Sequence, residues 1–168
     1  MYSTNGACDN AVFIFDSNID IGECAGGGVS SISVCGGSSN NLDGINRFEC
    51  NTNNECRGQT ITITNILNNF ELLCSGSASC RNANIQININ DPSITNIQIS
   101  CGGLNGCRNA MITINGLTEG NLQIGSISCS GTNGCRNAIF TTVNAQILSI
   151  NCPSADACNN CIVNGQSC

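Results

Sequence analysis

The chain has 168 residues, 15 of them cysteine, and a net charge of −6, with five arginines, no lysine and no histidine. It lacks the clustered basic residues of a nucleic-acid-binding surface, and the absence of histidine removes the commonest general base and metal ligand. No apolar run approaches the roughly 18 residues that span a membrane, and so many cysteines predict an oxidising location, either extracellular or on a cell or virion surface.

The segment from residue 1 to residue 49 is predicted to form irregular N-terminal coils. Its first twenty residues have no basic n-region, no apolar run and no small-residue cleavage site, so they do not resemble a signal peptide. Since disulfides need an oxidising route, we expect the sequence to be a processed or excerpted part of a longer protein. Three cysteines, Cys8, Cys24 and Cys35, lie in this segment.

From Cys50 onward, one unit recurs along the chain. It reads C-x5-C-R-N-A-x-I-x-I and is followed by a variable stretch and an Ile-rich run. Clean copies begin at Cys74, Cys101 and Cys129, a looser copy begins at Cys50, and a decayed copy begins at Cys152. Upstream, GACDNAVFIF matches the second half of the unit. The whole chain therefore predicts six to seven coils of 23–28 residues.

Each unit contains short runs in which apolar and polar residues alternate, as in Ile85-Gln86-Ile87. A second such run precedes each leading cysteine, with Ile97 and Ile99, then Ile127, then Leu148 and Ile150. Alternation of period two indicates a strand with one buried face. No segment has a 3.6-residue apolar period, so we expect essentially no helix. Short strands at a near-constant period predict an all-β, right-handed parallel β-solenoid. An antiparallel sandwich is the alternative, but it does not require the same residue at the same place in every unit.

Stacked coils place equivalent residues about 4.8 Å apart. One predicted buried column contains Ile61, Ile85, Ile112 and Phe140, a second contains Ile63, Ile87 and Ile114 and ends at Thr142, and a third contains Ala11, Ala83, Ala110 and Ala138. We expect a single solenoid domain over residues 1–168. It comprises irregular coils over 1–49, regular coils over 50–151 and a decayed coil over 152–168, with no recognisable polar cap at either end.

The recurrent C-x5-C spacing encloses a Gly/Ser/Asn-rich stretch that can bring the two α-carbons within the roughly 4.4–6.8 Å of a disulfide. We predict disulfides within each coil, and a ladder of disulfides between coils is the alternative. The predicted pairs are Cys50–Cys56, Cys74–Cys80, Cys101–Cys107, Cys129–Cys135 and Cys152–Cys158, with Cys161–Cys168 closing the C-terminal end. Two of Cys8, Cys24 and Cys35 could pair. In the repeat frame, Cys8 lacks its partner, so we hypothesise that it bonds to another molecule; a free or differently paired thiol is the alternative.

Four of the five arginines, Arg57, Arg81, Arg108 and Arg136, occupy one repeat position, directly after the second cysteine. Stacked guanidinium groups repel each other, so something should compensate their charge. One interpretation is that each arginine donates hydrogen bonds to loop carbonyls of a neighbouring coil. The other is a stripe that binds anions, for instance a sulfated or carboxylated polysaccharide.

Two other polar positions recur. Asn82, Asn109 and Asn137, with Asn10, follow the arginine position, and we predict that their stacked amides bond along the axis. On the outward strand positions, Thr62, Thr113 and Thr141 align with Gln86, and Thr64 aligns with Asn88, Asn115 and Val143. A regular Thr/Asn array on a flat sheet predicts an ice-binding face, with the Gln and Val positions interrupting it.

Catalytic and metal-binding motifs are not recognisable. The eleven acids are scattered and form no spaced pair on one strand face, and there is no phosphate loop and no histidine for a triad. Of the cysteines, Cys158 and Cys161 alone have the close spacing of a zinc knuckle. We therefore expect no enzyme activity, no metal and no cofactor.

The CRNA-x-I units over residues 50–150 resemble cysteine-rich right-handed parallel β-helix repeat proteins of protists and some large viruses; this resemblance implies the fold and no assigned function. The cysteine turns and the Thr/Asn richness also resemble insect antifreeze solenoids, which have shorter coils and a strict T-x-T repeat. We expect a non-catalytic structural protein whose uncapped coils associate end to end into fibres. A glycan-binding adhesive module is the second hypothesis and ice binding the third. Self and glycans are the expected partners, with no nucleic acid and no membrane span.

Overall fold

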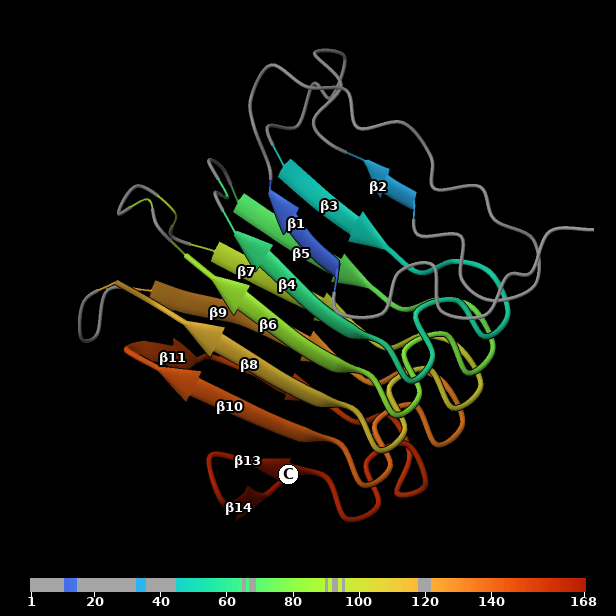
Figure 1. Ribbon diagram of the computed structural model, residues 1–168. Helices are drawn as coiled ribbons and strands as arrows, with labels where there is room; N and C mark the ends of the chain where they lie inside the picture. The colour runs from blue at the N-terminus through green and yellow to red at the C-terminus, as the bar shows by residue number, and fades with distance from the viewer. Residues whose placement is uncertain are drawn as a thin grey trace, which may run out of the picture.

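The alternating isoleucine runs form the strands of two facing parallel sheets (Figure 1). The computed structural model describes residues 11–14, 33–35, 45–64, 66, 69–89, 91, 94, 96–117 and 122–168. These residues form strands and turns and no helix, as the absence of a helical apolar period predicts.

The first sheet has the order β1-β4-β6-β8-β10-β13-β14. Its strands are β1 (Ala11–Ile14), β4 (Thr60–Thr64), β6 (Asn84–Asn88), β8 (Met111–Asn115), β10 (Ile139–Val143), β13 (Ile162–Val163) and β14 (Gln166–Ser167). The second sheet has the order β11-β9-β7-β5-β3-β2, and β12 also pairs with β9. Its strands are β2 (Ser33–Cys35), β3 (Ile45–Glu49), β5 (Asn69–Leu73), β7 (Asn96–Ser100), β9 (Leu122–Ser128), β11 (Ala145–Ile147) and β12 (Ile150–Asn151).

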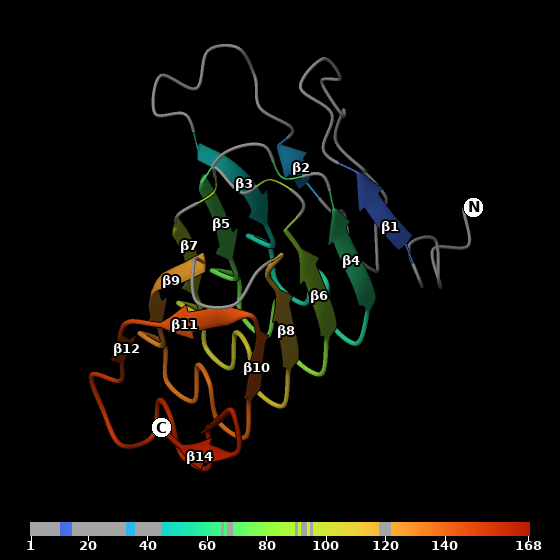
Figure 2. The same cartoon turned by 90° about the vertical axis from the view of Figure 1, so that its left-hand side faces the viewer.

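The chain alternates between the sheets and advances along one axis. A strand of the second sheet runs toward a cysteine loop, and the following strand of the first sheet runs back from it (Figure 1). The first sheet lies in front of the second and successive coils advance downward, an arrangement that the turned view in Figure 2 also shows. The path is therefore right-handed, and the predicted fold, a right-handed parallel β-solenoid, is confirmed.

The prediction of six to seven coils is wrong for the described part of the chain, which contains about four. Each complete coil consists of one strand of the second sheet and the following strand of the first sheet: β3 and β4, β5 and β6, β7 and β8, and β9 and β10. At the N-terminal end, β1 adds one strand to the first sheet, whereas β2 runs antiparallel to β3 and starts no coil of its own. At the C-terminal end, β13 extends the first sheet over two residues before the chain turns back.

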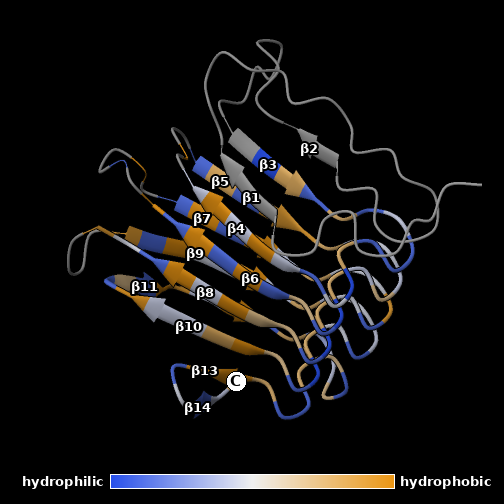
Figure 3. Ribbon diagram, in the orientation of Figure 1, coloured by the Kyte–Doolittle hydropathy of each residue, from blue (hydrophilic) through white to orange (hydrophobic). Residues whose placement is uncertain are grey.

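The core lies between the sheets and consists of stacked aliphatic columns. Figure 3 shows hydrophobic and hydrophilic residues alternating along the strands. Ile61 pairs with Ile85, Ile85 with Ile112, and Ile112 with Phe140, and each of these side chains is at most 1% exposed. This is the predicted first column.

Two details of the predicted buried positions are wrong, one in the alanine column and one in the apolar run before Cys152. Ala83, Ala110 and Ala138 are buried as expected, but Ala11 pairs with Ile61, two residues further along β4 than the repeat alignment placed it. A shift of two residues preserves the period-two alternation, so the local sequence match cannot detect it. Leu148, expected in a buried run, lies between β11 and β12 and is 53% exposed.

Each sheet has one edge covered by an antiparallel strand, contrary to the expectation of uncapped ends. β14 folds back on β13 with Val163 paired to Gln166, and β2 pairs with β3 at the opposite end of the second sheet. Asn164 and Gly165 connect β13 to β14 with φ of 49° and 81°. Two central residues with positive φ are the requirement of a type I′ turn, which Asn-Gly satisfies. Short antiparallel strands of this kind blunt the pairing capacity of a sheet edge.

Candidate anion-binding site

The site is built on the cysteine loops, which lie on one side of the solenoid (Figure 1). In five successive loops the two cysteines of each C-x5-C pair form one disulfide, with α-carbons 5.5–6.1 Å apart. The pairs are Cys50–Cys56, Cys74–Cys80, Cys101–Cys107, Cys129–Cys135 and Cys152–Cys158. A sixth disulfide joins Cys161 to Cys168. These bridges lie within coils. Cys8 and Cys24 are outside the described residues, and Cys35 lies in β2, where its side chain is not described.

Backbone hydrogen bonds stack the loops on one another. The Cys80 N–H donates to the Gly106 carbonyl at 2.7 Å, and the Cys107 N–H donates to the Gly134 carbonyl at the same distance. The close approach of neighbouring loops requires glycine inside the loops, at positions that the sequence analysis did not identify. A Cβ on Gly103 would lie 2.0 Å from the Gly76 carbonyl oxygen, and one on Gly131 would lie 2.1 Å from that of Gly103. Equivalent loop residues are therefore held in strict register.

The asparagine after each arginine position adopts a left-handed backbone conformation. The φ angles are 59° at Asn82, 56° at Asn109, 55° at Asn137 and 56° at Asn160, and the first loop has Gly58, with φ of 69°, in this place. Asparagine and glycine are the residues that adopt this conformation at least cost. The side-chain amides form the predicted ladder: each Nδ2 donates to the Oδ1 of the preceding coil at 3.0, 3.0 and 3.2 Å. Asn10 lies outside the described residues.

The arginines form a column beside this ladder, one on each of four successive coils. The Gly58 N–H donates to the Arg81 carbonyl, the Asn82 N–H to the Arg108 carbonyl and the Asn109 N–H to the Arg136 carbonyl, at 2.9–3.0 Å. The Cα positions of these loops therefore repeat at the coil spacing of about 4.8 Å. We call Arg57, Arg81, Arg108 and Arg136 the arginine column.

The arginine column has no carboxylate partner within the described residues. Both ion pairs found there involve Arg47. The Arg57 guanidinium donates to Asn54 Oδ1 at 3.0 Å, but the Nε atoms of Arg81, Arg108 and Arg136 are buried and have no hydrogen-bond partner. The arrangement therefore does not match the interpretation in which each arginine satisfies its donors on loop carbonyls.

Acidic residues are sparse around the column. Of the four loops that carry these arginines, the first alone contains an acid, Glu55, and its carboxylate accepts from the Thr52 N–H at 2.7 Å and from the Thr52 hydroxyl. Arg47, by contrast, lies on β3 in the second sheet, 2.6 Å from Glu71 and 3.4 Å from Glu49. The hydrogen bond to Glu71 raises the pKa of Arg47 above its usual value. Thus Arg47 has its charge neutralised locally, and the column does not.

The candidate ice-binding residues lie on the outward face of the first sheet. Thr62 pairs with Gln86, Gln86 with Thr113 and Thr113 with Thr141, so the predicted array is in register and is interrupted where expected. On the same strands, Met111 is 53% exposed and Val143 is 46% exposed. The face is therefore a mixture of hydroxyl, amide and aliphatic groups, and ice binding stays a prediction.

The described part of the chain contains two groups of three cysteines, and within each group the sulfurs lie within 4.8 Å of one another. One contains Cys50, Cys74 and Cys80, and the other contains Cys129, Cys135 and Cys158. All six sulfurs belong to disulfides, so their proximity reflects the stacking of bridges in adjacent coils.

Comparisons of the chain with protein-family models, with curated proteins and with solved structures give no match. The fold and the loops define its class: a cysteine-rich, right-handed parallel β-solenoid. Six disulfides indicate a protein that folds in an oxidising, extracellular environment. Among the described residues there is no helix with the length and hydrophobicity to cross a membrane.

Proposed function

We propose that this chain is a non-catalytic extracellular structural protein that adheres to acidic polysaccharide through its arginine column. The observation that supports this function is the alignment of four arginines on consecutive coils without carboxylate partners. Guanidinium groups bind sulfate and carboxylate through paired hydrogen bonds. A cell or virion surface, where such polymers occur, is the corresponding location.

The electrostatics of the column favour an anionic ligand. At the coil spacing, two neighbouring guanidinium charges repel by about 0.9 kcal/mol in bulk water. A bound polyanion replaces this repulsion with attraction, and its oxygens accept hydrogen bonds from the guanidinium groups. The overall charge of −6 does not oppose this binding locally, because the acids are largely absent from the arginine-bearing loops.

The disulfides prepare the surface for binding. Each loop of seven residues closed by a bridge stabilises the folded state by about 2.4 kcal/mol in the chain-entropy estimate. A loop that is already fixed loses little conformational freedom when a ligand binds, so more of the contact energy appears as affinity. Cross-linked loops with buried aliphatic columns therefore support a durable adhesive surface.

The test measures binding of the disulfide-intact protein to immobilised heparin as a sulfated probe. We expect Arg81→Gln/Arg108→Gln to weaken binding by roughly tenfold or more, because two charge-assisted contacts are lost. The matched control is Arg47→Gln, which removes a positive charge that Glu71 already neutralises, and it should bind like the wild type. Equal losses in both variants, or no binding by the wild type, would contradict the proposal. Rising salt should weaken wild-type binding steeply.

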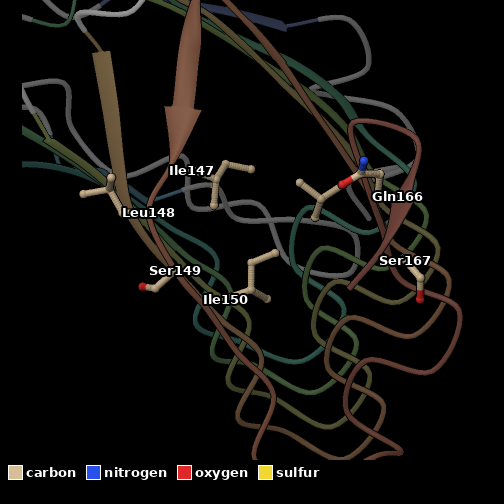
Figure 4. A pocket seen from close by; sticks show the side chains of 7 residues that line it. Ile147, Leu148, Ser149, Ile150, Gln166 and Ser167 are labelled. Carbon is tan, nitrogen blue, oxygen red and sulfur yellow. The ribbon is translucent and has the colours of Figure 1, made fainter.

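End-to-end association into fibres is the second candidate, and a hollow at the C-terminal end favours it. The hollow has a volume of about 310 Å³ and is lined by Ile147, Leu148, Ile150 and Val163, together with Ser149, Gln166 and Ser167 (Figure 4). It is the open end of the core, where a further coil would otherwise pack. The antiparallel strands β2 and β14 oppose simple parallel stacking of copies, because they cover one edge of each sheet.

Sedimentation velocity over a hundredfold range of concentration, with negative-stain microscopy, tests this candidate. Filaments or a rising sedimentation coefficient would support it, and a monomer at all concentrations would exclude it. Non-reducing electrophoresis would show whether Cys8 links molecules, as the sequence analysis hypothesises. Ice binding is tested separately by thermal hysteresis; unshaped ice crystals would eliminate it.

A further inference from the structure

We infer that the arginine column recognises the charge spacing of its ligand: it binds a linear polysaccharide that lies parallel to the solenoid axis and carries one anionic group per sugar. This inference rests on the proposed function and specifies its ligand class. Each successive sugar would meet one coil, and each sulfate or carboxylate would meet one guanidinium group.

The stacked loops hold the arginines at a fixed spacing along the solenoid axis. Inter-coil hydrogen bonds of 2.7–3.0 Å hold the loops of successive coils together, so the loops that carry the four arginines repeat at about 4.8 Å and together span roughly 14 Å. An extended β-1,4-linked hexopyranose chain advances by nearly the same length per sugar, and its equatorial carboxylates project alternately to its two edges. A chain that lies flat over the column therefore places one carboxylate beside each coil. A polymer charged on every sugar can therefore meet all four arginines, whereas a polymer charged on every second sugar meets two.

The asparagine ladder specifies a polyhydroxylated ligand. In the ladder, Asn109 uses one N–H to bond Asn82 and one lone pair to accept from Asn137. An amide has two N–H donors and two lone pairs, so Asn109 has one of each left, and its side chain is exposed. Arg81, Arg108 and Arg136 each directly precede an asparagine of the ladder, so a guanidinium group and an amide edge occur together on three of the four coils. Sugar hydroxyls need such a mixture of neutral donors and acceptors.

Nucleic acid fits this surface less well than a polysaccharide. Single-stranded nucleic acids bind through aromatic side chains on which bases stack, in addition to positive charge. The four arginine-bearing loops contain no aromatic residue. Their side chains are Asn, Ser, Thr, Ala and Leu besides the cysteines, the arginines and Glu55.

The column has defined ends, which sets the length of ligand that it can use. Arg57 begins it, and in the fifth loop the equivalent position is Asn159, whose carbonyl accepts from the Asn137 N–H at 2.9 Å. Four charged sugars therefore fill the site. Removing a central arginine, Arg108, leaves two adjacent cations at most, whereas removing the terminal Arg57 leaves three.

The experiment titrates the disulfide-intact protein with β-1,4-linked oligomannuronates of two to six sugars, which carry one carboxylate per sugar. We expect affinity to rise steeply up to four sugars and to change little beyond. Hyaluronan oligomers with four carboxylates, spaced on alternate sugars, should bind roughly tenfold more weakly than the tetramannuronate. For the tetramannuronate, Arg108→Gln should lose several-fold more affinity than Arg57→Gln, although each variant removes one charge.

The outcomes separate this inference from the proposed function. Equal affinity of the two polymers at equal charge number, with equal effects of Arg108→Gln and Arg57→Gln, would overturn recognition of spacing while acidic-glycan binding stands. Failure of every anionic oligosaccharide, including a mannan oligomer with one sulfate per sugar, would overturn both. If oligothymidylate of four nucleotides bound as well as the tetramannuronate, the preference for a polysaccharide would be wrong. Circular dichroism of each variant verifies the fold.

Discussion

Replacing Gly103 with alanine tests the close stacking of the cysteine loops, on which the register of the arginine column depends. The new methyl group would lie 2.0 Å from the Gly76 carbonyl oxygen and 2.7 Å from that of Ser75, both of which belong to the preceding coil. Both obstructing atoms belong to the backbone and not to a flexible side chain, so the two loops would have to separate by about 1 Å. The hydrogen bonds from the Gly103 and Gly102 N–H groups to the Cys74 carbonyl, at 3.3 and 3.1 Å, would be lost or weakened.

The expected cost follows from these contacts. Two inter-coil hydrogen bonds contribute about 1 kcal/mol each, and overpacking adds about 1–3 kcal/mol. Gly103→Ala should therefore lower the free energy of unfolding by about 3–5 kcal/mol. Gly102→Ala is the matched control, because the nearest atom to its methyl group is Ser130 Oγ at 3.4 Å, an ordinary contact. It should change stability by less than about 1 kcal/mol, in the stabilising direction if the unfolded chain loses freedom.

The assay is guanidinium unfolding of the disulfide-intact variants, followed by far-ultraviolet circular dichroism. A Gly103→Ala variant within 1 kcal/mol of the wild type would refute the stacking distance. If Gly102→Ala were as destabilising as Gly103→Ala, a general effect of replacing a loop glycine, rather than the contact with the Gly76 carbonyl, would be responsible.

Other substitutions test the remaining parts of the structure by the same unfolding assay. Asn109→Ala should lower the free energy of unfolding by about 3 kcal/mol, because it loses two ladder hydrogen bonds and forces alanine into a left-handed conformation. Asn109→Gly should lower it less, because glycine accepts that conformation. Equal losses in the two variants would contradict a role for the backbone conformation. Replacing Cys101 and Cys107 together with alanine should cost at least about 2.4 kcal/mol, and no change would mean that the bridge does not constrain the unfolded chain. Ile112→Ala should lower the free energy of unfolding by about 2–5 kcal/mol. Replacing its outward-facing neighbour, Thr113→Ala, should change that free energy by less than about 0.5 kcal/mol. Comparable losses would be inconsistent with the assigned strand faces.

The repeat determined much of the fold in advance because a solenoid brings together residues at the same place in each unit. The Ile61, Ile85 and Ile112 column and the asparagine ladder follow directly from that rule. The ends could not be derived in this way, because terminal coils have no neighbour to match. The register of β1 differs by two residues from the repeat alignment, a shift that strand alternation alone does not distinguish.

One end was nevertheless recognisable from local chemistry. Asn164-Gly165 is a strong hairpin signal, and it forms the turn between β13 and β14. The repeat alignment treated this segment as a decayed coil and so missed the cap.

The candidate site was predictable in position and not in detail. The repeat placed four arginines in one column, but it could not decide whether the side chains bond to neighbouring carbonyls. That depends on the side-chain torsions of each arginine, which the spacing of the repeat does not specify. The structure uses the Arg81, Arg108 and Arg136 carbonyls for coil-to-coil bonds and leaves the Nε atoms of these residues without partners.

The most direct test of the arginine column uses the side-chain Nε–Hε signals in nitrogen-15 NMR spectra. The chain has five arginines and no lysine, so five such signals report every cationic side chain. On titration with the tetramannuronate, we predict that the signals of Arg57, Arg81, Arg108 and Arg136 shift along one binding curve while that of Arg47 stays in place. Uniform small shifts of all five signals, or a shift confined to Arg47, would contradict a binding site on the column.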